Sequence, residues 1–175
     1  NSPFKAEVYF VNTTQIPDLK WGTQNPIMMR DPEFGPIRLR AFGIFTLRVG
    51  DPAVFLRQVV GTDSNYDIDE MMGQLRRTLV SRFTQALGSA QIAALDLAAN
   101  YDEVARKVKP LIRQDFEDMG LEIPKFIIEN ISLPPAVEKV LDQRTEMGIL
   151  GNMHQYAQYQ LARSLPDAAK TPTSM

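Results

Sequence analysis

Apolar and polar residues alternate most clearly over residues 37–49. One side of this stretch is apolar or small throughout, whereas the other side carries Arg38, Arg40 and Arg48. A period of two is typical of a strand that packs one face on a core. We therefore expect a long strand here, with its arginines on the outer face.

Two further stretches predict strands, one early in the chain and one late. Residues 4–13 are rich in β-forming residues, and residues 121–133 form a second such run. Pro124 favours a free sheet edge at its position, because proline cannot donate to a neighbouring strand. The many prolines and glycines of residues 14–36 predict a long loop, interrupted only by a short extended piece at residues 27–30.

Helical periodicity replaces alternation between these strands. Asp51, Asp67 and Asn100 each stand where an N-cap is expected, and Gly120 provides a stop signal. Pro110 lies inside the last of these helices and should kink it. The expected helices cover roughly residues 52–60, 68–87, 92–98 and 101–119.

The last part of the chain predicts one long helix. Its apolar residues recur about every 3.5 residues, which is typical of helices that pack against other helices, although Gly148 and Gly151 weaken its middle. Residues 134–165 are expected to form this helix, and residues 166–175 a disordered tail. On periodicity alone, packing within the monomer and self-association remain equal alternatives.

The order of these elements indicates a single α+β domain. Strands come first, helices occupy the middle, and one strand returns late. Residues 1–133 would form this domain, with an antiparallel or mixed sheet packed by helices. The C-terminal helix would extend from it.

Composition and charge narrow the function classes. The chain has 175 residues, 44% of them hydrophobic, and 19 Lys and Arg against 21 Asp and Glu, which gives a net charge of −2. This is the composition of a globular protein rather than a disordered one, and the lack of a basic surplus disfavours nucleic acid as a partner. No stretch approaches the roughly 20 apolar residues of a spanning helix.

Few residues offer chemistry for catalysis. The chain has no Cys and a single His, His154, which has no suitable neighbour in sequence. The oxygen-rich run from Asp63 to Glu70 resembles a calcium loop, but Ile68 stands where glycine is required and Gln74 where glutamate is required. We therefore expect no catalytic residues, no metal and no cofactor.

A basic stripe is the first candidate contact surface. Arg38, Arg40 and Arg48 would suit acidic lipid headgroups or an acidic neighbouring chain. The alternative, which we favour, is cross-strand pairing with carboxylates such as Glu7 or Glu129.

Trp21 is the second candidate contact. It is the only tryptophan and falls in the predicted loop, where it either binds a ligand or, as we favour, pins that loop to the core. Together with the arginine stripe, it defines an alternative function, a lipid- or small-ligand-binding domain.

Several motifs resemble one known family. The run Phe45–Leu56 (FTLRVGDPAVFL) is similar to a strand, turn and helix with an Asp-Pro hinge in the SPFH or Band 7 superfamily of stomatin, prohibitin and flotillin. The helix at residues 71–87 and the join from residues 120–122 through residues 127–134 into a helix also resemble that family.

Other motifs resemble a narrower, bacterial branch that is often labelled virion core protein-like. These motifs are residues 11–14, 18–23, 95–101 and 144–148. The resemblance spans about residues 4–165 and implies that the family's earliest strands and a membrane-attaching segment precede Asn1.

The resemblance implies a function that the residue patterns alone do not indicate. Family members are non-catalytic scaffolds that assemble through a C-terminal helix, in the cytoplasm and peripheral to the inner face of the cell membrane. It implies a homo-oligomer, with membrane lipids or membrane proteins as further partners and bacterial envelope organisation or stress response as the process. The residues expected to mediate self-association are Val137, Leu141, Leu150 and Tyr156.

Overall fold

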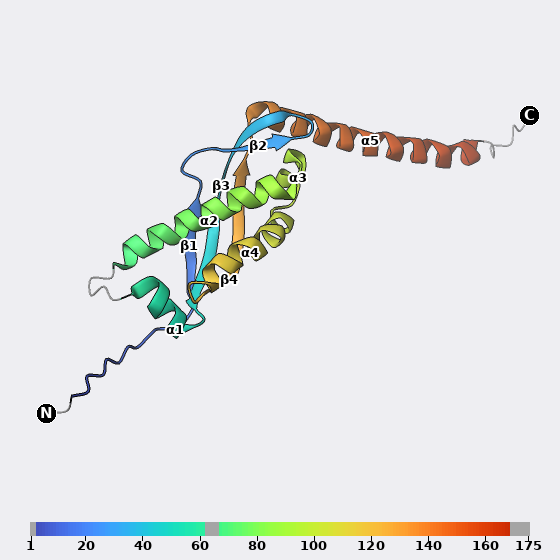
Figure 1. Cartoon of the computed structure of the whole chain (residues 1–175). Helices are drawn as coiled ribbons and strands as arrows, with labels where there is room; N and C mark the ends of the chain where they lie inside the picture. The colour runs from blue at the N-terminus through green and yellow to red at the C-terminus, as the bar shows by residue number, and fades with distance from the viewer. Residues whose placement is uncertain (1–2, 62–66, 169–175) are drawn as a thin grey trace, which may run out of the picture. The chain divides into compact units, whose positions relative to one another are not determined.

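Strand β3 (Gly35–Val49) pairs with every other strand of an antiparallel, four-stranded sheet (Figure 1). Strand β1 (Ile16–Gly22) pairs with its C-terminal part, and strand β2 (Ile27–Asp31) pairs with its N-terminal part. Strand β4 (Leu121–Ser132) runs along β3 from Arg40 to Val49. The sheet is therefore built around a single long strand.

The computed structural model describes residues 3–61 and 67–168. Residues up to Pro134 form one compact unit, and residues from Pro135 onward form a second. The predicted α+β class is confirmed, with an antiparallel sheet, packed helices and a C-terminal helix. Asp63 and Asn65 of the calcium-like run lie outside the described residues.

Helices α2 and α4 cover one face of the sheet, as Figure 1 shows. Asp67 caps α2 by accepting from the N–H of Asp69, and Asn100 caps α4 by accepting from the N–H of Glu103. These caps stand where the sequence predicted them. The helices of the compact unit are α1 (Pro52–Phe55), which continues into the π-helical turn η1 (Leu56–Val60), α2 (Ile68–Ala90), α3 (Ala94–Ala99) and α4 (Tyr101–Glu117).

The core lies between the sheet and these helices. Alternate side chains of β3 enter it, as the period of two predicted, and the apolar stripes of α2 and α4 meet them. Each large side chain buried here contributes about 1.5–3 kcal/mol to stability. The largest fully buried residues include Leu39, Phe45, Leu79, Phe83, Val108, Ile112 and Phe116.

The predicted strand at residues 4–13 is wrong, since these residues form neither strand nor helix. Within the predicted loop at residues 14–36, the short extended piece at residues 27–30 is confirmed as β2, whereas β1 was not predicted. The pairing of β1 with β3 shifts register between Ile16 and Leu19, and Asp18 has a φ of 55°. This irregularity accommodates Pro17, one of the prolines that favoured a loop over a strand in the sequence.

The late strand and its edge position agree with the sequence prediction. Strand β4 pairs only with β3 among the described residues, and Pro124 falls where the β3–β4 register shifts. The last helix, α5 (Pro135–Ala168), is longer than predicted, so residues 166–168 are helical rather than part of a tail. The remainder of the predicted tail, residues 169–175, lies outside the described residues.

Candidate functional site

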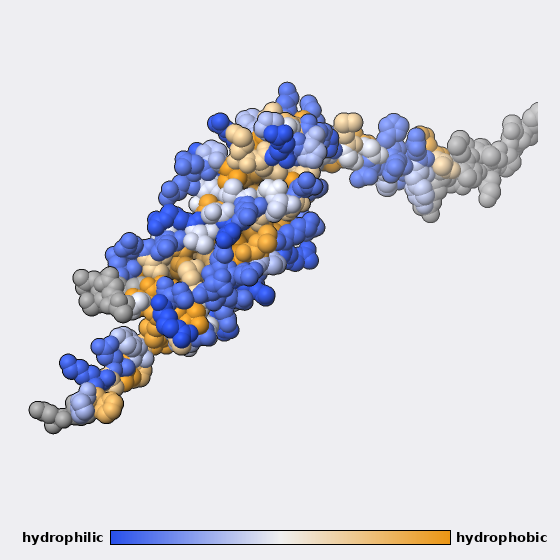
Figure 2. Space-filling view, in the orientation of Figure 1, coloured by the Kyte–Doolittle hydropathy of each residue, from blue (hydrophilic) through white to orange (hydrophobic). Residues whose placement is uncertain are grey.

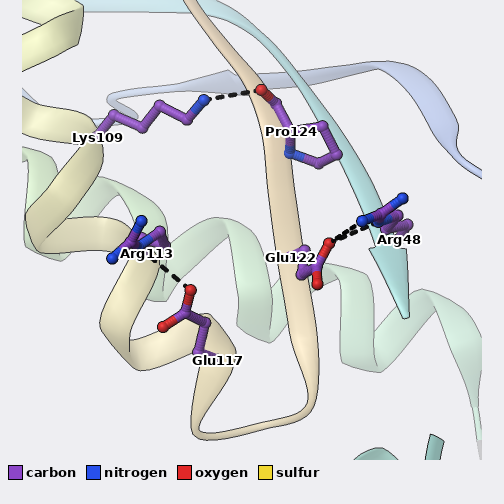
Figure 3. Close-up of polar contacts among 6 residues, drawn as sticks. All are labelled: Arg48, Lys109, Arg113, Glu117, Glu122 and Pro124. Carbon is purple, nitrogen blue, oxygen red and sulfur yellow. Dashed lines mark hydrogen bonds and ion pairs between the residues drawn. The ribbon is translucent and has the colours of Figure 1, made fainter. Parts of the chain in front are cut away.

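A cleft lined by α4, β3 and β4 gathers charged side chains (Figure 3). Arg48 Nε donates to Glu122 Oε2 over 2.6 Å, and the Lys109 ammonium donates to the carbonyl of Pro124 over 2.8 Å. Within α4, Arg113 forms an ion pair with Glu117, which lies one helical turn later. Since each cation in the cleft already has a protein partner, these contacts serve to fasten α4 to β4 and β4 to β3.

The three arginines of the predicted stripe differ in whether they form an ion pair. Arg48 makes the cross-strand ion pair that we favoured, but with Glu122 rather than Glu7 or Glu129, because the β3–β4 register places Glu122 directly opposite. Arg38 and Arg40 are exposed, and each lies opposite an uncharged residue: Met28 of β2 for Arg38 and Ser132 of β4 for Arg40. No carboxylate within residues 3–61 and 67–168 forms an ion pair with either of them.

Trp21 lies in the core rather than in a loop. It belongs to β1, is 3% exposed, and donates its indole N–H to the carbonyl of Ile127 over 3.2 Å. Its ring centroid lies 4.9 Å from that of Phe83 and 5.1 Å from that of Phe126, so three aromatic rings pack together. Trp21 therefore pins β1 to the core and presents no ligand-binding surface.

Gly43 makes this arrangement of strands feasible. A Cβ atom at this position would lie 2.0 Å from the carbonyl oxygen of Ile127, the same oxygen that accepts from Trp21. No real Cβ atom tolerates such a distance, so only glycine lets β3 and β4 approach here.

Asp31 is a buried polar residue that sequence reasoning missed. One carboxylate oxygen accepts from the N–H groups of Glu33 and Phe34, and the other accepts from the N–H of Ala94 over 2.7 Å. Burial alone would raise the pKa of Asp31, but these three bonds hold the pKa below its usual value. The Asp-Pro turn sequence signals the two local bonds, whereas nothing in the sequence signals the bond to Ala94.

Helix α5 exposes a series of large apolar side chains. Of the four residues predicted for self-association, Leu150 and Tyr156 are exposed, Leu141 is half-buried, and Val137 is 1% exposed. Figure 2 shows apolar and hydrophilic residues interleaved along α5. The exposed large apolar residues of this helix are Met147, Ile149, Leu150, Met153, Tyr156, Tyr159 and Leu161.

Neither a metal site nor a spanning helix is found in the part of the chain that the structure describes. No three His, Asp or Glu side chains there come close enough to hold a metal ion. Among the same residues, no helix combines the length and apolar character needed to cross a bilayer. The exposed side of α5 and the arginine-bearing face of the sheet are therefore the two candidate functional surfaces.

The comparison with known families gives one match. Residues 1–149 match the SPFH domain-Band 7 family, which covers the compact unit and the first part of α5. No curated protein matches the chain. The narrower, virion core protein-like branch stays a prediction.

Proposed function

This chain belongs to the SPFH domain-Band 7 family, a family of membrane-associated scaffold proteins, and from that premise we propose that it is a non-catalytic scaffold that self-assembles through α5. The observation that carries the proposal is the row of exposed apolar side chains on α5. Large apolar side chains repeated along one exposed helix mark a surface that another element covers.

The spacing of these side chains favours another helix as that element. Met147, Leu150, His154, Ala157 and Leu161 follow one another at intervals of three and four residues. This is the spacing of a seam between two or more helices, with larger residues flanking it.

Helix stability gives a second reason to expect a partner. Isolated helices are marginal in water and gain most of their stability from packing an apolar face. Gly148 and Gly151 make α5 weaker still, since each costs about 1 kcal/mol relative to alanine in a helix interior. Packing against a second copy of α5 would supply the stability that this stretch lacks.

The exposure pattern changes which residues we assign to the interface. Val137 is 1% exposed, so we leave it out of the proposed interface. Leu150 keeps that assignment, and Met153, which is 64% exposed and lies about 60° around the helix from it, joins it. Tyr156 is exposed but lies about 120° around the helix from Leu150, so we place it outside the seam.

The test is the mass of the full-length chain, measured by light scattering behind gel filtration over a concentration series. Leu150→Glu places a charge in the proposed seam and should lower the assembled mass. Gln155→Glu introduces the same charge on the opposite side of the helix, as judged from helical spacing, and should leave the mass unchanged. Far-ultraviolet circular dichroism of both variants controls for unfolding.

A monomeric wild-type chain at every concentration would contradict the proposal, as would equal masses for wild type and Leu150→Glu. A chain ending at Gln143 provides a further check, because it removes the exposed part of α5 but keeps the buried Val137. This shortened chain should be a folded monomer.

Location and process follow from the family rather than from any residue of the site. We propose a cytoplasmic protein, peripheral to the inner face of the cell membrane, that acts in bacterial envelope organisation or stress response. Its membrane association is supported by the family. Cell fractionation tests it: recovery only in the fraction without membranes would contradict it.

A further inference from the structure

The assembly proposal leaves unexplained the face of the sheet opposite α2 and α4. Residues directly opposite each other on antiparallel strands point to the same side, so the strand register identifies its members. We call this surface the open sheet face. It comprises Lys20, Met28, Arg30, Pro36, Arg38, Arg40, Phe42, Ile44, Thr46, Lys125, Ile127, Asn130 and Ser132, together with Arg48 and Glu122 at one end, and of these only Thr46 is buried.

The centre of the open sheet face is apolar. Ile44 lies between Lys20 on one neighbouring strand and Ile127 on the other. Phe42 is 50% exposed and Met28 is 61% exposed, so both large apolar side chains contact solvent. Together with Ile44 and Ile127, they give this face apolar surface beside its charges.

Cations surround this apolar centre. Lys20, Arg30, Arg38, Arg40 and Lys125 are all exposed, and none forms an ion pair with a carboxylate within the described residues. The only other charges on the face, Arg48 and Glu122, neutralise each other.

This positive charge is local. The whole chain carries a net charge of −2, so the cations are concentrated on one surface of a slightly acidic protein. The nearest exposed carboxylates on these strands, Asp18 and Glu129, are too few to cancel them. A surface of this kind attracts an anionic partner.

The shape and charge of the face favour one class of anionic partner. A second copy of the same face would bring like charges together, which disfavours face-to-face self-association. The cations and the exposed apolar side chains instead lie on one side of a single sheet, as binding to a plane requires. A bilayer offers both chemistries in that plane, phosphate groups for the cations and an apolar layer just beneath them for an aromatic side chain.

We propose that the open sheet face binds the anionic surface of a lipid bilayer, with Arg38 and Arg40 on the headgroup phosphates and Phe42 inserted beside them. This surface is distinct from the α5 seam. The proposal rests on the membrane location proposed above but not on self-assembly, although assembly would strengthen binding through avidity.

The first test is flotation of the full-length protein with vesicles. Wild type should bind vesicles of phosphatidylcholine mixed with phosphatidylglycerol, should not bind vesicles of phosphatidylcholine alone, and should bind more weakly as salt rises. Each cation removed near an anionic surface weakens binding about fivefold, so Arg38→Gln combined with Arg40→Gln should weaken it by a factor of about 25.

A matched control separates the face from net charge. Arg77→Gln combined with Arg106→Gln removes two exposed arginines from α2 and α4, on the other side of the sheet. This variant has the same net charge as the first and should bind as wild type does. Equal loss of binding in both double variants would overturn the proposal.

A second test concerns insertion. The emission of a tryptophan placed by Phe42→Trp should shift to shorter wavelength when anionic vesicles are added. Trp21 is buried, so its emission in the wild-type chain should not move and reports that the fold is intact. An unshifted Phe42→Trp spectrum would overturn the proposal, as would binding to soluble poly-glutamate but not to anionic vesicles, which would assign the face to an acidic polypeptide.

Discussion

The compact unit and helix α5 use the same kinds of apolar residue in opposite ways. Leu79 and Phe83 of α2 are fully buried, whereas Met147 and Leu150 of α5 are 70% and 63% exposed. Both stretches are helical, and both repeat apolar residues at helical spacing. Periodicity therefore reveals that a helix has an apolar face, but it does not reveal whether the covering partner belongs to the same chain.

Polar groups show the same difference between the two regions. In the compact unit, polar groups are joined across the fold, as in the bonds of Trp21 to Ile127 and of Asp31 to Ala94. In α5, by contrast, the Thr145 hydroxyl donates to the carbonyl of Leu141 and the Gln160 amide donates to the Tyr156 hydroxyl, each one helical turn away. The compact unit thus has long-range contacts that specify its fold, and α5 is the region where a contact with another copy would be gained.

The largest expected effect comes from removing a core ring. Phe83→Ala should lower the free energy of unfolding by about 3–5 kcal/mol, because it empties a fully buried position and removes a partner of Trp21. The matched change in α5, Met153→Ala, should alter it by less than about 0.5 kcal/mol in the monomer. Urea denaturation at a concentration that keeps the chain monomeric measures both values. Similar losses in the two variants would contradict the distinction between the regions.

Two glycines sharpen the comparison further. Gly43→Ala should cost about 2 kcal/mol or more, because the new methyl group would collide with the carbonyl of Ile127 and force β3 from β4. Gly151→Ala should instead stabilise α5 by up to about 1 kcal/mol, since no atom lies within 4 Å of the new group. Thermal denaturation reports the first change, and the helical signal in circular dichroism reports the second. Equal signs for the two changes would refute this prediction.

The smallest expected effect concerns acid stability. Because the pKa of Asp31 is lowered in the folded state, its carboxylate stabilises the fold above the unfolded pKa of about 3.9, and this contribution is lost as the pH falls through the folded pKa. Asp31→Asn should cost about 1–2 kcal/mol at neutral pH, through the weakened bond to the Ala94 N–H. Urea midpoints measured from pH 7 down to pH 3 should therefore converge for wild type and variant. Parallel curves would show that Asp31 does not titrate as proposed.

Local signals explain what the sequence could predict. The alternation of β3 and the caps Asp67 and Asn100 are properties of a few neighbouring residues, and the structure contains all of them. Strand β1 could not be predicted in this way, because Pro17 and Asp18 interrupt its pattern and only the pairing with β3 makes it a strand. Tertiary pairing here overrides local propensity.

For the candidate surfaces too, local features could be predicted from the sequence, but long-range contacts could not. The basic character of the outer face of β3 was readable from Arg38 and Arg40, but the partner of Arg48 depends on a register between residues 74 positions apart. The burial of Trp21 likewise depends on Ile127, which lies 106 positions later in the chain. Long-range contacts of this kind leave no mark in a short stretch of sequence.

The dependence of the whole sheet on β3 also sets the order of events during synthesis. Strands β1, β2 and β3 leave the ribosome before β4, so one edge of β3 lacks its partner strand until β4 has emerged, after α2, α3 and α4. Until β4 emerges, the indole N–H of Trp21 lacks the carbonyl of Ile127, and the apolar side of the sheet is incomplete. Folding of the nascent chain therefore waits for the pairing of β4 with β3. Helix α5 follows β4 directly in the chain and therefore leaves the ribosome after it. In the proposed assembly, a copy would thus complete this sheet before α5 could meet a neighbour, which would protect the unfinished domain from premature association.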